Sequence, residues 1–202
     1  MTTGIDAILF DLGNVLLTLD WERAAGRLSE RAGRSAGELL AYAQAAPAVR
    51  ELSVGRISRQ EFFQECVRGL GFRGSAGEFE EMWSDMFHPN EPMLALARSL
   101  KGKLPRVLLS NTNAIHMRAI FARFPELGEL EGHVLSHEVG YEKPDPRIYQ
   151  HALRRHRLRA SRTVFVDDLA ENVAGAQAVG LRAIQYRDAA QTLAALAALG
   201  VG

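Results

Sequence analysis

The chain has 202 residues, with 24 Lys and Arg against 24 Asp and Glu and a formal net charge of zero. This balance excludes a nucleic-acid binder that depends on a broad basic face. The longest apolar run, residues 193–199, is far too short to cross a bilayer. We expect a cytoplasmic protein for two reasons. The chain has a single cysteine, Cys66, and its start, MTTGID, lacks the features of a signal peptide.

Short aliphatic runs alternate with helical patterns along much of the chain. We expect strands at residues 7–10, 106–109, 133–136, 163–166 and 182–186. Helical patterns lie at residues 91–100, 114–123, 146–155, 171–179 and 189–199. Strands that alternate with helices predict an α/β fold built on a doubly wound parallel sheet.

The interval from residue 20 to residue 88 has a different pattern, with no strand-like run. Amphipathic patterns predict helices at residues 21–32, 36–46, 59–70 and 76–87, the last with an apolar stripe of Phe79, Trp83 and Phe87. We expect a loop at residues 88–92. The sequence therefore predicts a core domain, residues 1–18 and 89–202, with a helical cap, residues 19–88, inserted after the first strand.

Polar residues follow four of the predicted strands. Ligands of open parallel sheets bind beyond the carboxyl ends of the strands, so these residues are the first candidates for a site. They are Asp11 after the first strand, Ser110 and Asn111 after the second, Lys143 after the third, and Asp167 and Asp168 after the fourth.

Two kinds of chemistry are present among these residues. Carboxylates that are crowded together repel one another unless a cation compensates, so Asp11, Asp167 and Asp168 indicate a bound hard divalent ion, for which oxygen ligands favour Mg²⁺. Donors suited to a tetrahedral oxyanion come from Ser110, Asn111, Lys143 and the amides of the loop Leu12-Gly13-Asn14. A phosphoryl group beside a metal makes Asp11 a candidate nucleophile.

Four segments of the sequence, FDLGNV, LSNTN, KPDPRIY and VFVDD, resemble in their order the motifs of the haloacid dehalogenase-like hydrolases. Most of that family are Mg²⁺-dependent phosphatases that work through an aspartyl-phosphate, and the resemblance covers essentially the whole chain. It implies that Asp11 is the nucleophile and a metal ligand, and that Ser110 and Lys143 bind phosphate. The resemblance also implies metal binding by Asp167 and Asp168, with Asp168 the preferred direct ligand, and by the Gly13 carbonyl.

Gly13 departs from the family pattern, because its phosphatases typically carry there a second Asp that protonates the leaving group. One interpretation is a pseudoenzyme that binds phosphate without turnover. Another is a 2-haloacid dehalogenase, which needs no metal and leaves the acid pair without a use. A third is a phosphatase of small phosphorylated metabolites, because FDLGNVLL and ELSVGRISRQEFF are similar to a branch that acts on sugar phosphates such as glucose 1-phosphate. An anomeric hydroxyl leaves more easily without an acid.

A response-regulator receiver has a similar set of residues, but there the acid pair precedes the phosphorylated Asp. Among other candidates, we expect His116 and His137 to be surface or helix-face residues, although either is a candidate substitute acid. The Asn172 amide is a candidate contact for Asp11 or a metal-bound water, with a structural role at a helix start as an equal alternative. We expect Trp21 to pack at the hinge of the cap and Arg23 to be solvated, with contact to the leaving group as the alternative. No feature of the sequence indicates an oligomeric state.

Overall fold

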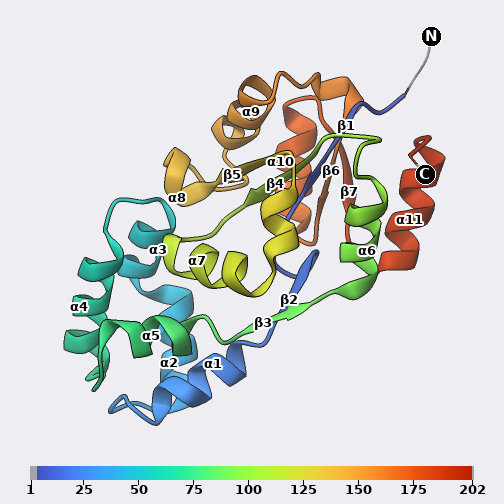
Figure 1. Cartoon of the computed structure of the whole chain (residues 1–202). Helices are drawn as coiled ribbons and strands as arrows, with labels where there is room; N and C mark the ends of the chain where they lie inside the picture. Colours follow the sequence, from blue (N-terminus) through green and yellow to red (C-terminus); the bar gives the residue numbers. More distant parts are fainter. Residues whose placement is uncertain (1–3, 202) are drawn as a thin grey trace.

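The computed structural model describes residues 4–201. Residues 1–3, which begin the MTTGID segment and the predicted core domain, and residue 202 lie outside the described part. Figure 1 shows a central sheet flanked by helices, with a group of helices, α1 to α5, at one end of the molecule.

The central sheet has five parallel strands in the order β5-β4-β1-β6-β7. Burial on both faces explains why these strands are short, continuous apolar runs. Their bounds are β1 Ala7–Phe10, β4 Arg106–Ser110, β5 Gly132–Leu135, β6 Thr163–Asp167 and β7 Arg182–Gln185. They match the predicted strands to within a residue or two, except that Ser136 begins a short helix, α8 (Ser136–Val139), instead of ending β5.

Helices cover both faces of this sheet because successive side chains of a strand point to opposite sides. Ile8 and Phe10 of β1 belong to the apolar cluster that includes α6, α7 and α11. Leu9, between them, belongs to the cluster that includes α9 and α10. The bounds of these helices are α6 Glu91–Ser99, α7 Ala114–Arg123, α9 Pro146–Arg155, α10 Ala170–Ala178 and α11 Ala189–Ala198, with short 3₁₀ helices at Pro125–Glu129 and Ala160–Arg162. The predicted doubly wound α/β fold is confirmed.

The helices between β1 and β4 form a group that we call the helical unit. Its members are α1 Trp21–Ser29, α2 Ala36–Ala45, α3 Pro47–Ser53, α4 Arg59–Leu70 and α5 Ala76–Trp83. Capping boxes at Ser35, Ser58 and Ser75 fix the starts of α2, α4 and α5. Buried side chains of the helical unit make a separate apolar cluster that contains Phe62, Phe79 and other large residues.

A two-stranded antiparallel ribbon joins the helical unit to the sheet. Its strands are β2 (Leu17–Leu19) and β3 (Phe87–Pro89), and Thr18 lies opposite His88. Three predictions are therefore wrong: that no strand occurs up to residue 88, that residues 88–92 form a loop, and that a helix extends to residue 87. Helix α5 ends at Trp83, and Phe87 pairs with Leu19 instead of extending the helix. Strands of three residues carry too few side chains for their alternation to be recognised.

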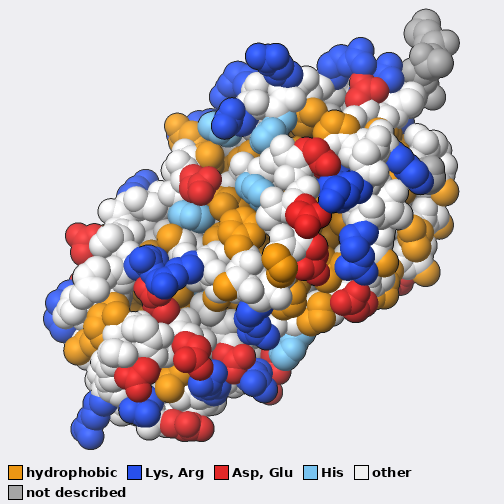
Figure 2. Space-filling model, viewed as in Figure 1, with side chains coloured by type: hydrophobic (Ala, Val, Ile, Leu, Met, Phe, Trp, Pro, Cys, Tyr) orange, Lys and Arg blue, Asp and Glu red, His pale blue; other side chains and the backbone are white. Residues whose placement is uncertain are grey.

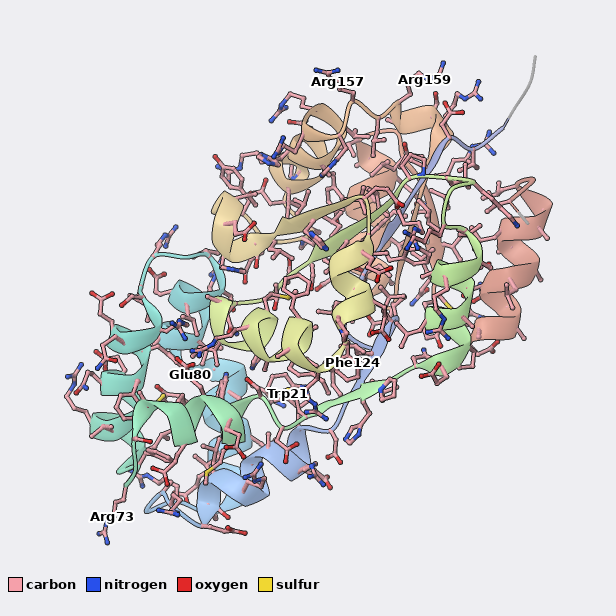
Figure 3. The ribbon with its side chains drawn as sticks, viewed as in Figure 1. Trp21, Arg73, Glu80, Phe124, Arg157 and Arg159 are labelled. Atoms are coloured by element: carbon pink, nitrogen blue, oxygen red, sulfur yellow. The ribbon has the colours of Figure 1, made fainter. Side chains whose placement is uncertain are left out.

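The surface agrees with the neutral composition. Figure 2 shows acidic and basic side chains interspersed over the face in view, with basic side chains gathered at the top over the end of α9. Arg157 and Arg159 lie in that basic region (Figure 3). Within residues 4–201, no helix is long and apolar enough to cross a membrane.

Candidate active site

The carboxyl ends of three neighbouring strands bring the predicted polar residues together. Asp11 follows β1, Ser110 ends β4, and Asp167 ends β6, directly before Asp168. Because β4, β1 and β6 are adjacent and parallel, these residues share one edge of the sheet. Carboxylate oxygens of Asp11, Asp167 and Asp168 all lie within 4.8 Å of one another. The predicted acid cluster therefore exists as a spatial group.

Lys143 reaches this group from the connection between α8 and α9. Its Nζ lies 2.6 Å from Asp11 Oδ1 and 2.6 Å from Asp167 Oδ2, and its side chain is buried. The Asn111 amide fixes the Lys143 backbone: Nδ2 donates to the Lys143 carbonyl at 2.9 Å, and the Lys143 N–H donates to Oδ1 at 2.7 Å. The Asn111 side chain thus holds Lys143 in place.

The charges at the strand ends do not balance. Three carboxylates and one ammonium group leave an excess of negative charge in a largely buried place. The pKa of Asp11 is raised to about 6: burial is the largest cause, Lys143 opposes the increase, and the neighbouring Asp167 adds to it. An oxygen-rich set of donors with excess negative charge is suited to a hard divalent cation.

The two acids after β6 have different surroundings. Both oxygens of Asp167 accept hydrogen bonds, Oδ1 from the Leu169 N–H at 2.9 Å and Oδ2 from Lys143, and the Asn172 amide lies within 3.1 Å of each. The Asn172 amide therefore contacts Asp167 and not Asp11, which was one of its candidate partners. Asp168 is half-buried, and its Oδ2 accepts from Asn14 Nδ2 at 3.1 Å. Asp168 thus keeps more of its oxygen surface available than Asp167.

The loop after Asp11 carries the residue that departs from the family pattern. Asn14 has a φ of 56°, a left-handed conformation that Asn tolerates well, whereas the φ of Gly13 does not lie in that region. A Cβ added at Gly13 would lie 3.1 Å from Leu19 Cδ1. The backbone therefore does not require glycine, and the space in front of position 13 is filled by Leu19.

A pocket of about 200 Å³ opens beside these strand ends. Its walls come from the Asp11 loop, the β2–β3 ribbon, the helical unit and the start of α7. The lining residues are Leu12, Gly13, Leu19, Trp21, Val49, Ser53, Trp83, Met86, Phe87, Ser110, Asn111, Thr112, Asn113 and His116. Trp21 lies at the start of α1, where the helical unit meets the rest of the molecule (Figure 3).

Comparison with known proteins places this arrangement in a family. The model of the family described as "haloacid dehalogenase-like hydrolase" matches residues 5–180 of this chain. The chain belongs to the haloacid dehalogenase-like hydrolases. It is 28% identical to a sesquiterpene phosphatase of Aspergillus oryzae, over 95% of each chain. It is also 26% identical to a D-ribitol-5-phosphate phosphatase of Bacteroides thetaiotaomicron, over 92% of this chain and 94% of the other.

A solved structure of a family member provides a spatial comparison. It is a haloacid dehalogenase-like enzyme of Bacteroides thetaiotaomicron in complex with magnesium and inorganic phosphate. This chain is similar to it with a TM-score of 0.82 and 26% identity, over 91% of this chain and 95% of that one.

Several residues of this haloacid dehalogenase-like hydrolase lie where the sequence did not indicate. His116 is buried among aromatic rings instead of lying on the surface, and burial lowers its pKa to about 4. His137 is half-buried on α8 and does not line the pocket. Trp21 lines the pocket, whereas the Arg23 side chain is 52% exposed, as expected, and its Nε lies 3.0 Å from Asp85 Oδ2.

The sequence did not indicate several other pocket residues, because the strands and the helix that carry them were not predicted. Leu19 and Phe87 belong to the ribbon, and Val49 and Ser53 belong to α3. A signal for α3 is present in the sequence, since Pro47 occupies the first turn, where proline is favoured, and Ala46 before it is extended.

Proposed function

We propose that this chain is a Mg²⁺-dependent phosphatase that hydrolyses a small phosphate monoester through an aspartyl-phosphate on Asp11. The observation that carries the proposal is the meeting of Asp11, Asp167, Asp168 and Lys143 at one edge of the sheet. The two relatives, which are named as phosphatases, and the magnesium–phosphate complex of a family member support it.

The residues at the strand ends fit the proposed metal ion. Asp11, the Gly13 carbonyl and Asp168 would hold it, with Asp167 direct or through water, because Asp167 already accepts hydrogen bonds at both oxygens. A bound Mg²⁺ supplies positive charge that lessens the repulsion between Asp11 and a substrate phosphate. The excess of carboxylate over ammonium at the site supports this assignment.

The roles that we propose for the protein groups follow from their chemistry. Asp11 attacks phosphorus, so that an Asp11 oxygen–phosphorus bond forms as the bond to the leaving oxygen breaks. Lys143, Ser110 and the amides of the loop 12–14 hold the phosphoryl oxygens, where charge develops in the transition state. Water then hydrolyses the aspartyl-phosphate and releases inorganic phosphate. Asn111 contributes by holding the backbone of Lys143.

We propose the division into a core, residues 1–18 and 89–202, and a helical cap, residues 19–88. The separate apolar cluster of the helical unit supports it, as does the ribbon through which the chain leaves and re-enters the core. The cap meets the core beside Lys143, where Arg50 Nε lies 3.6 Å from Glu142 Oε2 and Ser136 Oγ donates to the Ser53 carbonyl at 2.7 Å. These contacts support the proposal that the cap shields the site from water.

The substrate in this proposal is a small phosphorylated metabolite, with a sugar phosphate such as glucose 1-phosphate as the candidate from the resemblance. The named activities of the two relatives concern a terpene and a polyol, which differ strongly in polarity. A cytoplasmic location also remains part of the proposal, supported by the buried free thiol of Cys66.

A second candidate function rests on Gly13, which leaves the site without the usual acid at that position. In that case the protein binds phosphate without turnover. A 2-haloacid dehalogenase has less support, because it would give no use to the pair Asp167 and Asp168.

The deciding experiment is a screen of small phosphate monoesters with Mg²⁺ and with EDTA. We expect release of inorganic phosphate with Mg²⁺ and release about 10²-fold slower, or slower still, with EDTA. Binding of phosphate without any turnover would favour the pseudoenzyme. Release of halide from 2-haloacids in the presence of EDTA would favour the dehalogenase.

A further inference from the structure

We infer that the pocket beside Asp11 accepts an uncharged, largely apolar organic group, so that this protein prefers monophosphates of hydrocarbon-rich alcohols to sugar or polyol phosphates. The inference rests on the proposed phosphatase function and adds to it the class of leaving group. Its basis is the character of the walls, the engagement of the two side-chain amides and the absence of charge in the described lining.

The walls of the pocket are mostly hydrocarbon. Leu19, Trp21, Val49, Met86 and Phe87 line it from the ribbon, the helical unit and the segment between α5 and β3. The His116 ring adds to this surface, since it lies edge-on to Phe87 at 5.1 Å between ring centres and stacks on Trp83 at 6.1 Å. A hydrocarbon group placed here gains by leaving water.

The side-chain amides in the lining are already engaged. Asn111 uses both ends of its amide on the backbone of Lys143. Asn113 Oδ1 accepts from the backbone N–H groups of Ile115 and His116, and its Nδ2 lies 3.2 Å from His116 Nδ1. A polyol would bring several hydroxyls into a pocket whose two side-chain amides are already engaged, and each buried hydroxyl without a partner weakens binding.

The pocket also lacks charge. No Lys, Arg, Asp or Glu is among the lining residues in the described part of the chain. His116, the remaining ionisable residue type in the lining, is neutral near pH 7, since burial lowers its pKa to about 4. A leaving group that carries a carboxylate or a second phosphate would therefore find no counter-charge in this pocket.

The apolar surface continues up to the strand ends. Leu19 Cδ1 lies 3.1 Å from the place that a Cβ at position 13 would take, beside the nucleophile candidate. Where related phosphatases typically have a carboxylate, this chain presents a leucine side chain. The first carbons of the leaving group thus meet Leu19, which favours an alkyl chain over a hydroxylated one.

Turnover of a matched pair of substrates tests this inference. Hexyl phosphate and ribitol 5-phosphate are both esters of primary alcohols, and the polyol is the better leaving group because its hydroxyls withdraw electrons. With Mg²⁺, we expect kcat/KM for hexyl phosphate to exceed that for ribitol 5-phosphate by at least about tenfold, as burial of several CH₂ groups predicts. Equal values or a preference for the polyol would overturn the inference and leave the proposed phosphatase intact.

A binding measurement keeps the test independent of turnover. Calorimetry with Mg²⁺ present compares hexylphosphonate with methylphosphonate, which have the same head group and cannot be hydrolysed as esters. We expect hexylphosphonate to bind at least about tenfold more tightly. Equal affinities would overturn the inference even in an inactive protein, whereas tight binding of hexylphosphonate without any phosphatase activity would count against the proposed function alone.

Two variants connect the effect to the pocket. Trp21 is 37% exposed, so Trp21→Gln removes apolar wall with little risk to folding, and Leu193→Gln is a control at a 47% exposed position on α11. We expect Trp21→Gln to weaken hexylphosphonate by about fivefold and to leave methylphosphonate unchanged. Leu193→Gln should change neither. A Trp21→Gln variant with unaltered hexylphosphonate affinity would count against the pocket as the binding place.

Discussion

The charged site at the carboxyl ends of the strands and the apolar pocket beside it offer different kinds of interaction. At the edge, Asp11, Asp167, Asp168 and Lys143 gather four ionisable groups within reach of one another. The pocket next to them has no Lys, Arg, Asp or Glu among its described lining residues. In the proposed function, the charged site binds the group common to all phosphate monoesters, and the apolar pocket distinguishes what the phosphate is attached to.

The two regions also come from different parts of the fold. The charged residues stand on strand ends or on the α8–α9 connection, whose positions the parallel sheet fixes. Most apolar lining comes from the ribbon and the helical unit, outside the sheet. Substitutions in the apolar lining from the ribbon and the helical unit should therefore change substrate choice without disturbing the proposed catalytic groups, and variants that affect one region alone test this separation.

The largest effect should follow loss of the nucleophile candidate. Asp11→Asn removes the charge and the nucleophilic oxygen, and we expect phosphatase turnover to fall by roughly 10³-fold or more, measured with the best substrate of the screen. Asp188→Asn is a suitable control, because Asp188 caps α11 and Asn is an equally good cap. Substantial turnover by the Asp11→Asn protein would remove Asp11 from the role of nucleophile.

Removal of the metal should have the next largest effect. Like the Asp11→Asn substitution, it affects the charged site and not the pocket. EDTA should reduce turnover by about 10²-fold or more, and added Mg²⁺ should restore it. Mg²⁺ should also raise the melting temperature of the wild-type protein, because a ligand that binds the folded state stabilises it. Asp168→Asn should lessen that rise, and the same rise in wild type and variant would argue against Asp168 as a ligand.

The charged region could be predicted from the sequence because its physical basis is local. Each apolar strand is directly followed by its polar residue, so Asp11, Ser110 and Asp167 could be placed at one edge once the strands were recognised. The engagement of the Asn111 amide by the Lys143 backbone could not be predicted, since it depends on the path of a connection 32 residues further along the chain.

The pocket could not be predicted because it depends on contacts between distant segments. Leu19 and Phe87 face each other only because two three-residue strands pair. The burial of His116 depends on Trp83 and Phe87, which come from another part of the chain. Nothing in the residues around His116 distinguishes an inward-facing histidine from one on a helix surface.

His116 offers a test of whether the pocket excludes charge. Its pKa in the folded protein is about 4, below the ordinary value of 6.5, so the unfolded chain binds more protons between these values. Stability should therefore fall as the pH falls from 6.5 toward 4, by roughly 3 kcal/mol from this residue. Urea unfolding of wild type and His116→Gln across this range measures the effect.

The stability of the His116→Gln protein should fall less than that of wild type between pH 6.5 and 4, even if its stability at pH 7 differs from that of wild type. His88→Gln serves as the control, because the His88 side chain is 44% exposed and the variant leaves His116 in place. It should keep the wild-type slope. An identical slope in wild type and His116→Gln would show that the pocket tolerates a proton on this ring.

The smallest effect concerns the border between the two regions, where Leu19 lies in front of Gly13. Gly13→Asp alone should give little gain, because its Cβ would lie 3.1 Å from Leu19 Cδ1 and Leu19 must shift to admit the carboxyl group. Gly13→Asp combined with Leu19→Ala makes the space, and the new acid should speed hydrolysis of alkyl phosphates by about tenfold over Leu19→Ala alone. Aryl phosphates, whose leaving groups need no proton, should gain less. An equal gain for both classes, or none for either, would argue that the leaving group obtains its proton elsewhere.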